Sequence, residues 1–386
     1  MCDVRTRTFL LVTAACVGLW WGCGDGSGPT SKPRTFLMGF SAIPPRVDST
    51  AGVIAAINNW APHADAAIMH VSPPWAAMLG GATPDSAVRT VELPLANYYR
   101  TKGLAIVFTV DATDGLNRAA EAPELVSAGR SITDTMVQRL YRDWVLAVAT
   151  RIRPDYLGLA AETNLIRQLA PDSVYQALVT MANAVVAQIR LRRFSSKLFV
   201  SVQVETAWGR PNGPYQGIAQ DLADFPFVEA LGLSSYPYLG GFADPESIPL
   251  DYYSRIPQGT TLPVLVVEGG WTSVSVGGVM SSPAEEARYI TRQEQLLDSA
   301  RARGVFQHVL RSRPARLPAA ATGFDLAAVH APRVGRQRDA CEAGPRGVGR
   351  RVQPALPGIA IESQSAPMLN AALSAPVTLS ALALSV

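Results

Sequence analysis

Short apolar runs alternate with longer amphipathic segments along most of this chain. Runs of about four to eight apolar residues, bounded by Gly, Pro or Asp, are typical of strands that are buried on both faces. Eight segments begin with such a run, and we predict a strand in each of them: 36–45, 66–75, 104–115, 156–165, 198–208, 228–239, 262–271 and 305–310.

The segments between these strands have apolar residues spaced for helices. In 132–152 an apolar residue recurs at every fourth position behind Ser131, the predicted N-cap. Segments 173–192 and 283–303 are also predicted helices, and the second opens with Pro283 and two glutamates, as expected at a helix N-terminus. Alternating strands and helices favour right-handed βαβ units and a parallel sheet.

Eight such units within roughly 280 residues fit a (β/α)8 TIM barrel, whose usual size is about 250 residues. A doubly wound open sheet is the alternative. However, the first βα turn, "GFSAIPPRVD", has no Gly-rich phosphate loop, and no Walker-type stretch occurs in the sequence. We therefore predict an α/β barrel over 35–310, with its last strand and helix unit truncated.

The first 23 residues have the pattern of an export signal. Arg5 and Arg7 precede an apolar run too short to span a membrane comfortably, and small residues follow it. Gly22 and Cys23, followed by a polar linker over 24–34, resemble a bacterial lipoprotein junction, although two tryptophans precede them. Two outcomes remain open: a lipoprotein anchored to the membrane through Cys23, or a secreted or periplasmic protein.

Composition and charge restrict the remaining possibilities. The hydrophobic content of 48% is enough for a globular core, and all four cysteines lie in the leader or the tail, so no disulfide framework is expected. The net charge is +3, but residues 311–386 hold nine arginines and four acidic residues, which leaves −2 for the rest. We therefore expect no nucleic-acid partner, and we expect a monomer.

Polar and aromatic residues follow the predicted strands, where barrel enzymes have their active sites. The candidates are His70, Asp111, Glu162, Asn164, Gln203, Glu205, Trp208, Tyr236, Glu268 and Trp271. Carboxylates beside aromatic rings indicate a carbohydrate cleft, because sugar rings stack on such faces. Glu162 and Glu268 follow strands four and seven, which face each other across a barrel. Two carboxyl groups about 5–5.5 Å apart are the machinery of retaining glycoside hydrolysis.

Three motifs carry a resemblance to a known family. "GLAAETN", "GLSSYPYL" and "PVLVVEGGWTS" resemble strands four, six and seven of the glycoside hydrolase clan A barrels, nearest to the family 53 arabinogalactan endo-β-1,4-galactanases. The resemblance implies that Glu162 is the acid/base, that Glu268 is the nucleophile, and that the Tyr236 hydroxyl donates a hydrogen bond to the nucleophile. One position departs from the family: Ala161 stands where an Asn usually binds the sugar 2-hydroxyl, with Asn164 as a possible substitute.

The sequence thus predicts an exported glycosidase that cleaves a β-linked polysaccharide or oligosaccharide with retention. The alternative is a non-catalytic, carbohydrate-binding surface barrel. Asp111 and Glu205 are expected to bind substrate or to partner buried polar groups, and Trp208 and Trp271 to form platforms or simply to pack. No cofactor is expected, and no metal, because the four histidines lack ligand spacing and His70 fits a hydrogen-bonded rim residue.

The tail, 311–386, shows neither helical nor strand periodicity. It is either a disordered basic extension or the product of a slipped reading frame. With permitted wobble bases, the same one-base shift turns Phe324–Asp339 into a Leu-Gly-Leu segment and Gly344–Gln353 into a Trp-containing amphipathic helix. The second interpretation predicts a strand cut short near Leu310, no native eighth helix and a poorly ordered tail, and such a product is expected to fold poorly or to lack activity.

Overall fold

The computed structural model describes residues 34–42, 50–209, 216–256, 259–275 and 279–307. Within these ranges, eight parallel strands form a closed barrel in sequence order, and β1 pairs with β8 to complete it. The strands are β1 (Leu37–Ser41), β2 (Ala66–Val71), β3 (Ala105–Val110), β4 (Tyr156–Gly158), β5 (Lys197–Gln203), β6 (Ala230–Ser235), β7 (Val264–Gly269) and β8 (Gly304–Gln307).

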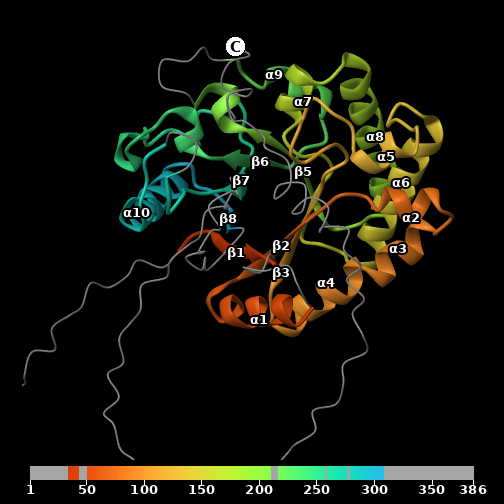
Figure 1. Cartoon of the computed structure of the whole chain (residues 1–386), viewed down its shortest axis with the longest axis horizontal. Helices are drawn as coiled ribbons and strands as arrows, with labels where there is room; N and C mark the ends of the chain where they lie inside the picture. Colours follow the sequence, from red (N-terminus) through yellow and green to blue (C-terminus); the bar gives the residue numbers. More distant parts are fainter. Residues whose placement is uncertain (1–33, 43–49, 210–215, 257–258, 276–278, 308–386) are drawn as a thin grey trace, which may run out of the picture. The chain divides into compact units, whose positions relative to one another are not determined.

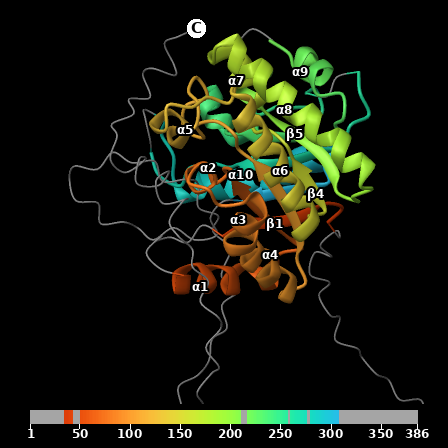
Figure 2. The same cartoon turned by 90° about the vertical axis from the view of Figure 1, so that its right-hand side faces the viewer.

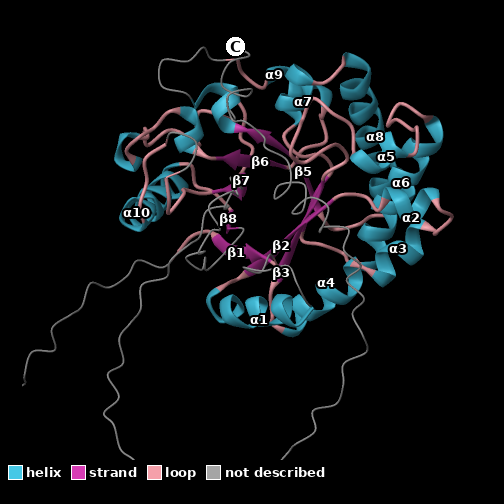
Figure 3. Cartoon of the chain, viewed as in Figure 1, coloured by secondary structure: helices cyan, strands magenta, loops and turns pink. Residues whose placement is uncertain are grey.

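Helices lie around the outside of this barrel (Figures 1 and 3). They are α1 (Thr50–Trp60), α2 (Trp75–Leu79), α3 (Pro84–Thr90), α4 (Glu92–Thr101), α5 (Pro123–Ser127), α6 (Thr135–Arg151), α7 (Thr163–Leu169), α8 (Asp172–Leu191), α9 (Ala219–Asp224) and α10 (Pro283–Ser299). In the turned view, α6 lies between α3 and α8 along one side of the barrel (Figure 2). None of the helices in the described ranges is both long and apolar enough to cross a bilayer.

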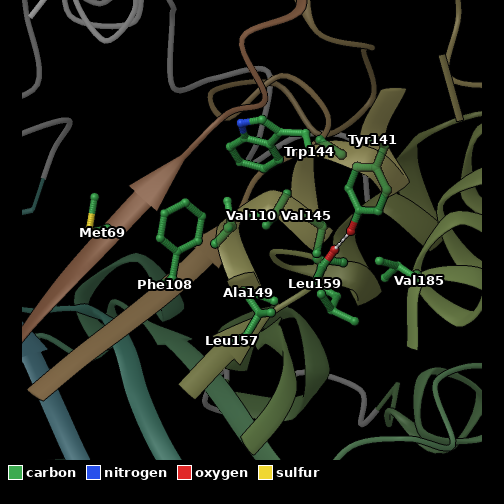
Figure 4. Packing of buried hydrophobic residues seen from close by; sticks show 14 of the residues in the cluster. Met69, Phe108, Val110, Tyr141, Trp144, Val145, Ala149, Leu157, Leu159 and Val185 are labelled. Carbon is green, nitrogen blue, oxygen red and sulfur yellow. Dashed lines mark hydrogen bonds between the residues drawn. The ribbon is translucent and has the colours of Figure 1, made fainter. Parts of the chain in front are cut away.

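The main core fills the space between the strands and this helical layer. Figure 4 shows one part of it, where Phe108 of β3 and Leu157 of β4 pack beside α6 residues that include Trp144. The Phe108 and Trp144 rings have centroids 5.9 Å apart. The Tyr141 hydroxyl, buried among them, donates a hydrogen bond of 2.5 Å to the Leu159 carbonyl oxygen, so no polar atom of that side chain is left unpaired.

The interior of the barrel has its own small core, in which two glycines make room for two phenylalanine rings. A Cβ on Gly39 would lie 2.6 Å from the Phe306 ring, and a Cβ on Gly158 would lie 2.6 Å from the Phe199 ring. Gly39 on β1 is paired with Phe306 on β8, and Gly158 on β4 is paired with Phe199 on β5. Large and small residues on adjacent strands therefore fill the barrel, so it is a packed core and not a channel.

The predicted barrel is confirmed, and each of the eight predicted segments overlaps one of its strands, although β5 and β8 each begin one residue earlier than predicted. The alternative of a doubly wound open sheet is wrong, because the sheet closes. Predictions for the signal segment, the linker, residues 308–310 of the last strand and the tail concern residues outside the described ranges.

Two details of α6 differ from the prediction. The helix begins at Thr135, behind Asp134, while Ser131 hydrogen-bonds Glu121 and Thr133 instead of capping the helix. Strict four-residue spacing is also wrong for the buried face. Because four residues turn by 400°, such a row drifts around the helix, and Met136 is 37% exposed while Val137 is buried.

Candidate active site

Glu268 lies at the C-terminal end of β7, where the strand contains a β-bulge. β6 and β7 are in regular register up to Leu233 opposite Val266, and the next pair is Ser234 opposite Glu268, so Val267 is the extra residue. The Nε2 atom of His70, on β2, lies 2.9 Å from the Val267 carbonyl oxygen. A bulge changes the direction of the following side chain. The contact from His70 holds the bulged main chain of β7 in place, and with it the direction of the Glu268 side chain.

The two glycines after Glu268 allow β7 to approach β6 closely. Gly269 has φ 149°, and a Cβ there would lie 2.3 Å from the Ser235 carbonyl oxygen. That same oxygen accepts a hydrogen bond of 3.1 Å from the Gly270 amide. No other residue type fits such a contact with backbone. The sequence Glu-Gly-Gly therefore holds the Glu268 carboxylate against the end of β6.

Tyr236, directly after β6, reaches the Glu268 carboxylate. Its hydroxyl donates a hydrogen bond of 2.8 Å to Glu268 Oε1. Burial raises the pKa of Tyr236 well above its usual value, and the nearby Glu268 charge raises it further. The phenol is therefore a permanent donor at neutral pH, as the sequence-based resemblance implies.

Glu162 follows β4 in an uncommon backbone conformation. It precedes α7 with φ 46° and ψ 48°, in the left-handed region, and its amide donates a hydrogen bond of 2.9 Å to Ser201 Oγ on β5. Non-glycine residues rarely adopt this conformation, and where they do, the surrounding structure enforces it. This strained conformation places the Glu162 carboxyl at the mouth of the barrel. The residue is only 8% exposed.

Arg118 is a functional candidate that the sequence analysis missed. It belongs to the loop between β3 and α5, and its Nε donates a hydrogen bond of 2.8 Å to Glu162 Oε2. Its Nη1 donates bonds of 2.7 and 2.8 Å to the two carboxylate oxygens of Asp111. It is the only basic residue between Val110 and Pro123, in a loop that opens with two aspartates, and this was the signal available in the sequence.

The electrostatic environment separates the two glutamates. Burial raises the pKa of Glu162, Arg118 opposes that shift, and the charge of Glu268 adds to it, so the pKa is raised overall. Burial alone would lower the pKa of Arg118, but the carboxylates of Asp111 and Glu162 more than offset this and raise it. Arg118 is therefore a cation at every accessible pH.

A further carboxyl, that of Glu205, is buried near the end of β5. It opens the short π-helical turn Glu205–Gly209 after β5 and accepts three hydrogen bonds. The donors are Gln203 Nε2 at 2.6 Å, Ser235 Oγ at 2.9 Å and Tyr252 OH at 2.9 Å. Burial raises the pKa of Glu205 to about 7. Of the two roles predicted for Glu205, these contacts favour the partnering of buried polar groups.

Three other predicted substrate contacts are placed differently. Asn164 has no exposed surface, and its amide exchanges hydrogen bonds of 2.9 and 2.8 Å with the Gln203 main chain, which ties α7 to β5. Gln203 is occupied by Glu205 and by the Thr206 amide. Trp271 is 1% exposed and stacks on Tyr289 at a centroid distance of 5.3 Å. Asn164 and Trp271 therefore pack inside the protein, whereas Gln203, at 8% exposed, is as accessible as Glu162, and its substrate-binding role stays a prediction.

The remaining candidates lie at the mouth or outside the described atoms. Asp111 directly follows β3 and accepts hydrogen bonds from Arg118, and His70 contacts the β7 bulge. The Trp208 side chain falls outside the described part of the structure. Among the described residues, no group of three or more His, Cys, Asp or Glu side chains is arranged to hold a metal ion.

Comparison with known proteins identifies the fold. No protein-family model matches the chain, and no curated protein matches it in sequence. The AHE enzyme from Alicyclobacillus herbarius has a similar structure, with a TM-score of 0.50 and 11% identity over 72% of this chain and 89% of that chain. This likeness shows the fold alone. Glycoside hydrolases have similar structures at lower TM-scores.

Two such hydrolases are also among the similar structures. A structure of fungal β-1,4-galactanases has a TM-score of 0.45 and 14% identity, over 65% of this chain and 79% of that chain. An exo-β-1,4-mannosidase from Opitutaceae bacterium strain TAV5 has a TM-score of 0.47 and 15% identity, over 73% of this chain. This chain spans about half of the mannosidase, 53% of its length.

Proposed function

We propose that this protein is a glycosidase that cleaves a β-linked polysaccharide or oligosaccharide with retention of anomeric configuration. One observation carries the proposal: the Tyr236 hydroxyl holds Glu268 by a hydrogen bond of 2.8 Å at the end of β7. Burial, together with the charge of Glu268, raises the pKa of Glu162. Two interacting carboxyl groups of which one stays ionised and the other holds a proton are what a retaining mechanism needs.

In the first step, a Glu268 carboxylate oxygen bonds to the anomeric carbon while the bond from that carbon to the glycosidic oxygen breaks. Glu162 gives its proton to the departing oxygen, so the leaving group departs as a neutral alcohol. In the second step, Glu162 takes a proton from water, the water oxygen bonds to the anomeric carbon, and Glu268 is released as a carboxylate. Tyr236 holds Glu268 in position throughout.

The test is to assay the full chain on aryl β-glycosides and on β-linked polysaccharides, with reducing ends as the measure. Glu268→Gln should leave only a trace of turnover while the far-UV circular dichroism stays unchanged, and azide should restore turnover to Glu268→Ala as the inverted glycosyl azide. Exposed Glu294→Gln on α10 is the matched control and should retain full activity. Undiminished hydrolysis by Glu268→Gln would overturn the assignment.

A second function, carbohydrate binding without catalysis, is favoured by the ion pair between Arg118 and Glu162 at 2.8 Å. An arginine that keeps Glu162 ionised would prevent it from acting as an acid. Retention of the protein on an insoluble polysaccharide with no release of reducing ends would support this function. Release of reducing ends would contradict it.

We also propose export, with Cys23 as the site of a lipid anchor. The support is the Arg-containing apolar leader and the Gly-Cys junction in the sequence. In a bacterial host, the intact chain should fractionate with membranes, whereas Cys23→Ser should appear in the soluble exported fraction. An unchanged distribution would exclude lipidation at Cys23.

A further inference from the structure

The guanidinium of Arg118 lies between two carboxylates in a site that excludes most water. Glu162 accepts from Nε on one side, and both oxygens of Asp111 accept from Nη1 on the other. The three residues are 7% (Arg118), 8% (Asp111) and 8% (Glu162) exposed. One fixed positive charge is thus shared between two negative partners.

The sharing matters because a single arginine beside a carboxyl lowers its pKa by about 1–3 units. A guanidinium does not lose its proton in proteins, so its effect cannot be removed by a change of pH. Only a negatively charged side chain next to the guanidinium can offset its effect on the carboxyl pKa. Asp111 is in that position, on the side of the guanidinium away from Glu162.

We propose that Asp111 is a positioning residue whose charge offsets that of Arg118, which lets Arg118 hold the Glu162 carboxyl in place without fixing it in the ionised form. This inference rests on the proposed function only where it assigns Glu162 the task of an acid. The other described charged and titratable groups that interact with Glu162 are Glu268 from β7 and Tyr236 from β6. Neither contributes a positive charge.

The experiment follows the titration of Glu162 by carbon NMR in full-length protein labelled at glutamate carboxyl carbons, with Glu162→Gln to assign the signal. Asp111→Asn should lower the Glu162 midpoint by about 1 unit or more. Arg118→Gln should raise it. The double variant removes one charge of each sign, so its Glu162 midpoint should return toward the wild-type value. The remaining difference from wild type should be less than about half of the shift seen in Asp111→Asn.

Asp114→Asn is the matched control. Asp114 lies in the same loop, but its carboxylate accepts from the Leu116 and Asn117 amides and not from Arg118. Its replacement should move the Glu162 midpoint by less than half as much as Asp111→Asn does. If Arg118→Gln does not fold, Asp111→Asn and the double variant still decide the question.

An unmoved midpoint in Asp111→Asn would overturn the proposal. So would a double variant that keeps the full shift of Asp111→Asn, because a purely structural role for Asp111 gives no compensation. The titration needs no substrate. A wild-type protein that cleaves no glycoside would therefore contradict the proposed function without touching this result, whereas an active enzyme should show the same shifts in the basic limb of kcat/KM.

Discussion

The free energy of unfolding of the wild-type protein is expected to fall as pH rises, because Glu205 ionises. Replacing Glu205 with Gln should abolish this contribution. Burial raises the pKa of Glu205 from 4.5 to about 7 in the folded state. A carboxyl with a raised pKa binds its proton more tightly when folded, so its contribution is fully favourable below pH 4.5 and is lost as pH rises through 7. The difference of 2.5 units corresponds to about 3 kcal/mol at 1.36 kcal/mol per unit.

The measurement is the free energy of unfolding in urea, taken from pH 4.5 to pH 8 for wild type and Glu205→Gln. The variant should be slightly less stable at pH 4.5, because its new amide group faces the Gln203 amide and a hydrogen bond worth about 1 kcal/mol is lost. Relative to wild type, the free energy of unfolding of the variant should then rise by about 3 kcal/mol between pH 4.5 and pH 8. The exposed Glu294→Gln should show no such growth. A difference between wild type and Glu205→Gln that does not change with pH would refute the reasoning.

Three further outcomes are expected. Tyr236→Phe should lower kcat/KM about 10- to 100-fold without a loss of melting temperature, because it removes one hydrogen bond to an ionised group. Gly269→Ala should cost about 3 kcal/mol or more of unfolding free energy, because its Cβ would overlap the facing β6 carbonyl oxygen, whereas Gly129→Ala, at φ 64° with open space around it, should cost about 1–2 kcal/mol. The pH profile of kcat/KM should be bell-shaped, and in the residual activity of Glu268→Gln its basic limb should move to lower pH, because loss of the neighbouring charge lowers the pKa of Glu162. The glycine argument is contradicted if Gly269→Ala and Gly129→Ala lose the same unfolding free energy. An unchanged kcat/KM in Tyr236→Phe, or an unmoved basic limb in Glu268→Gln, would contradict the other two arguments.

The barrel could be predicted because strands buried on both faces have a strong and simple pattern. Every strand candidate overlapped a real strand, even β4, which is only three residues long. Helix details were less accessible to sequence. The buried face of α6 depends on where the helix begins, and Ser131 was an attractive cap that a distant carboxylate, Glu121, engages instead.

The site was predictable only where strand ends decide it. The contact between Tyr236 and Glu268 follows from their places at the C-terminal ends of the adjacent strands β6 and β7. Arg118 was missed because its partner Glu162 is 44 residues away, and no local pattern shows which loop residue folds back into the mouth. The apolar pattern likewise does not specify the burial of Asn164, in the first turn of α7, or of Trp271, in the loop after β7.

The left-handed backbone of Glu162 has a consequence for laboratory evolution of this barrel. A side chain held at φ 46° costs about 1–2 kcal/mol that Gly does not pay, and Asn also tolerates this conformation better than Glu does. Selection for heat resistance alone would therefore enrich Gly or Asn at position 162, since most proteins are not at their stability optimum. The most heat-resistant variants from such a library would have an unstrained backbone at position 162 and no catalytic acid. Only a screen for product formation in every round would retain the glutamate.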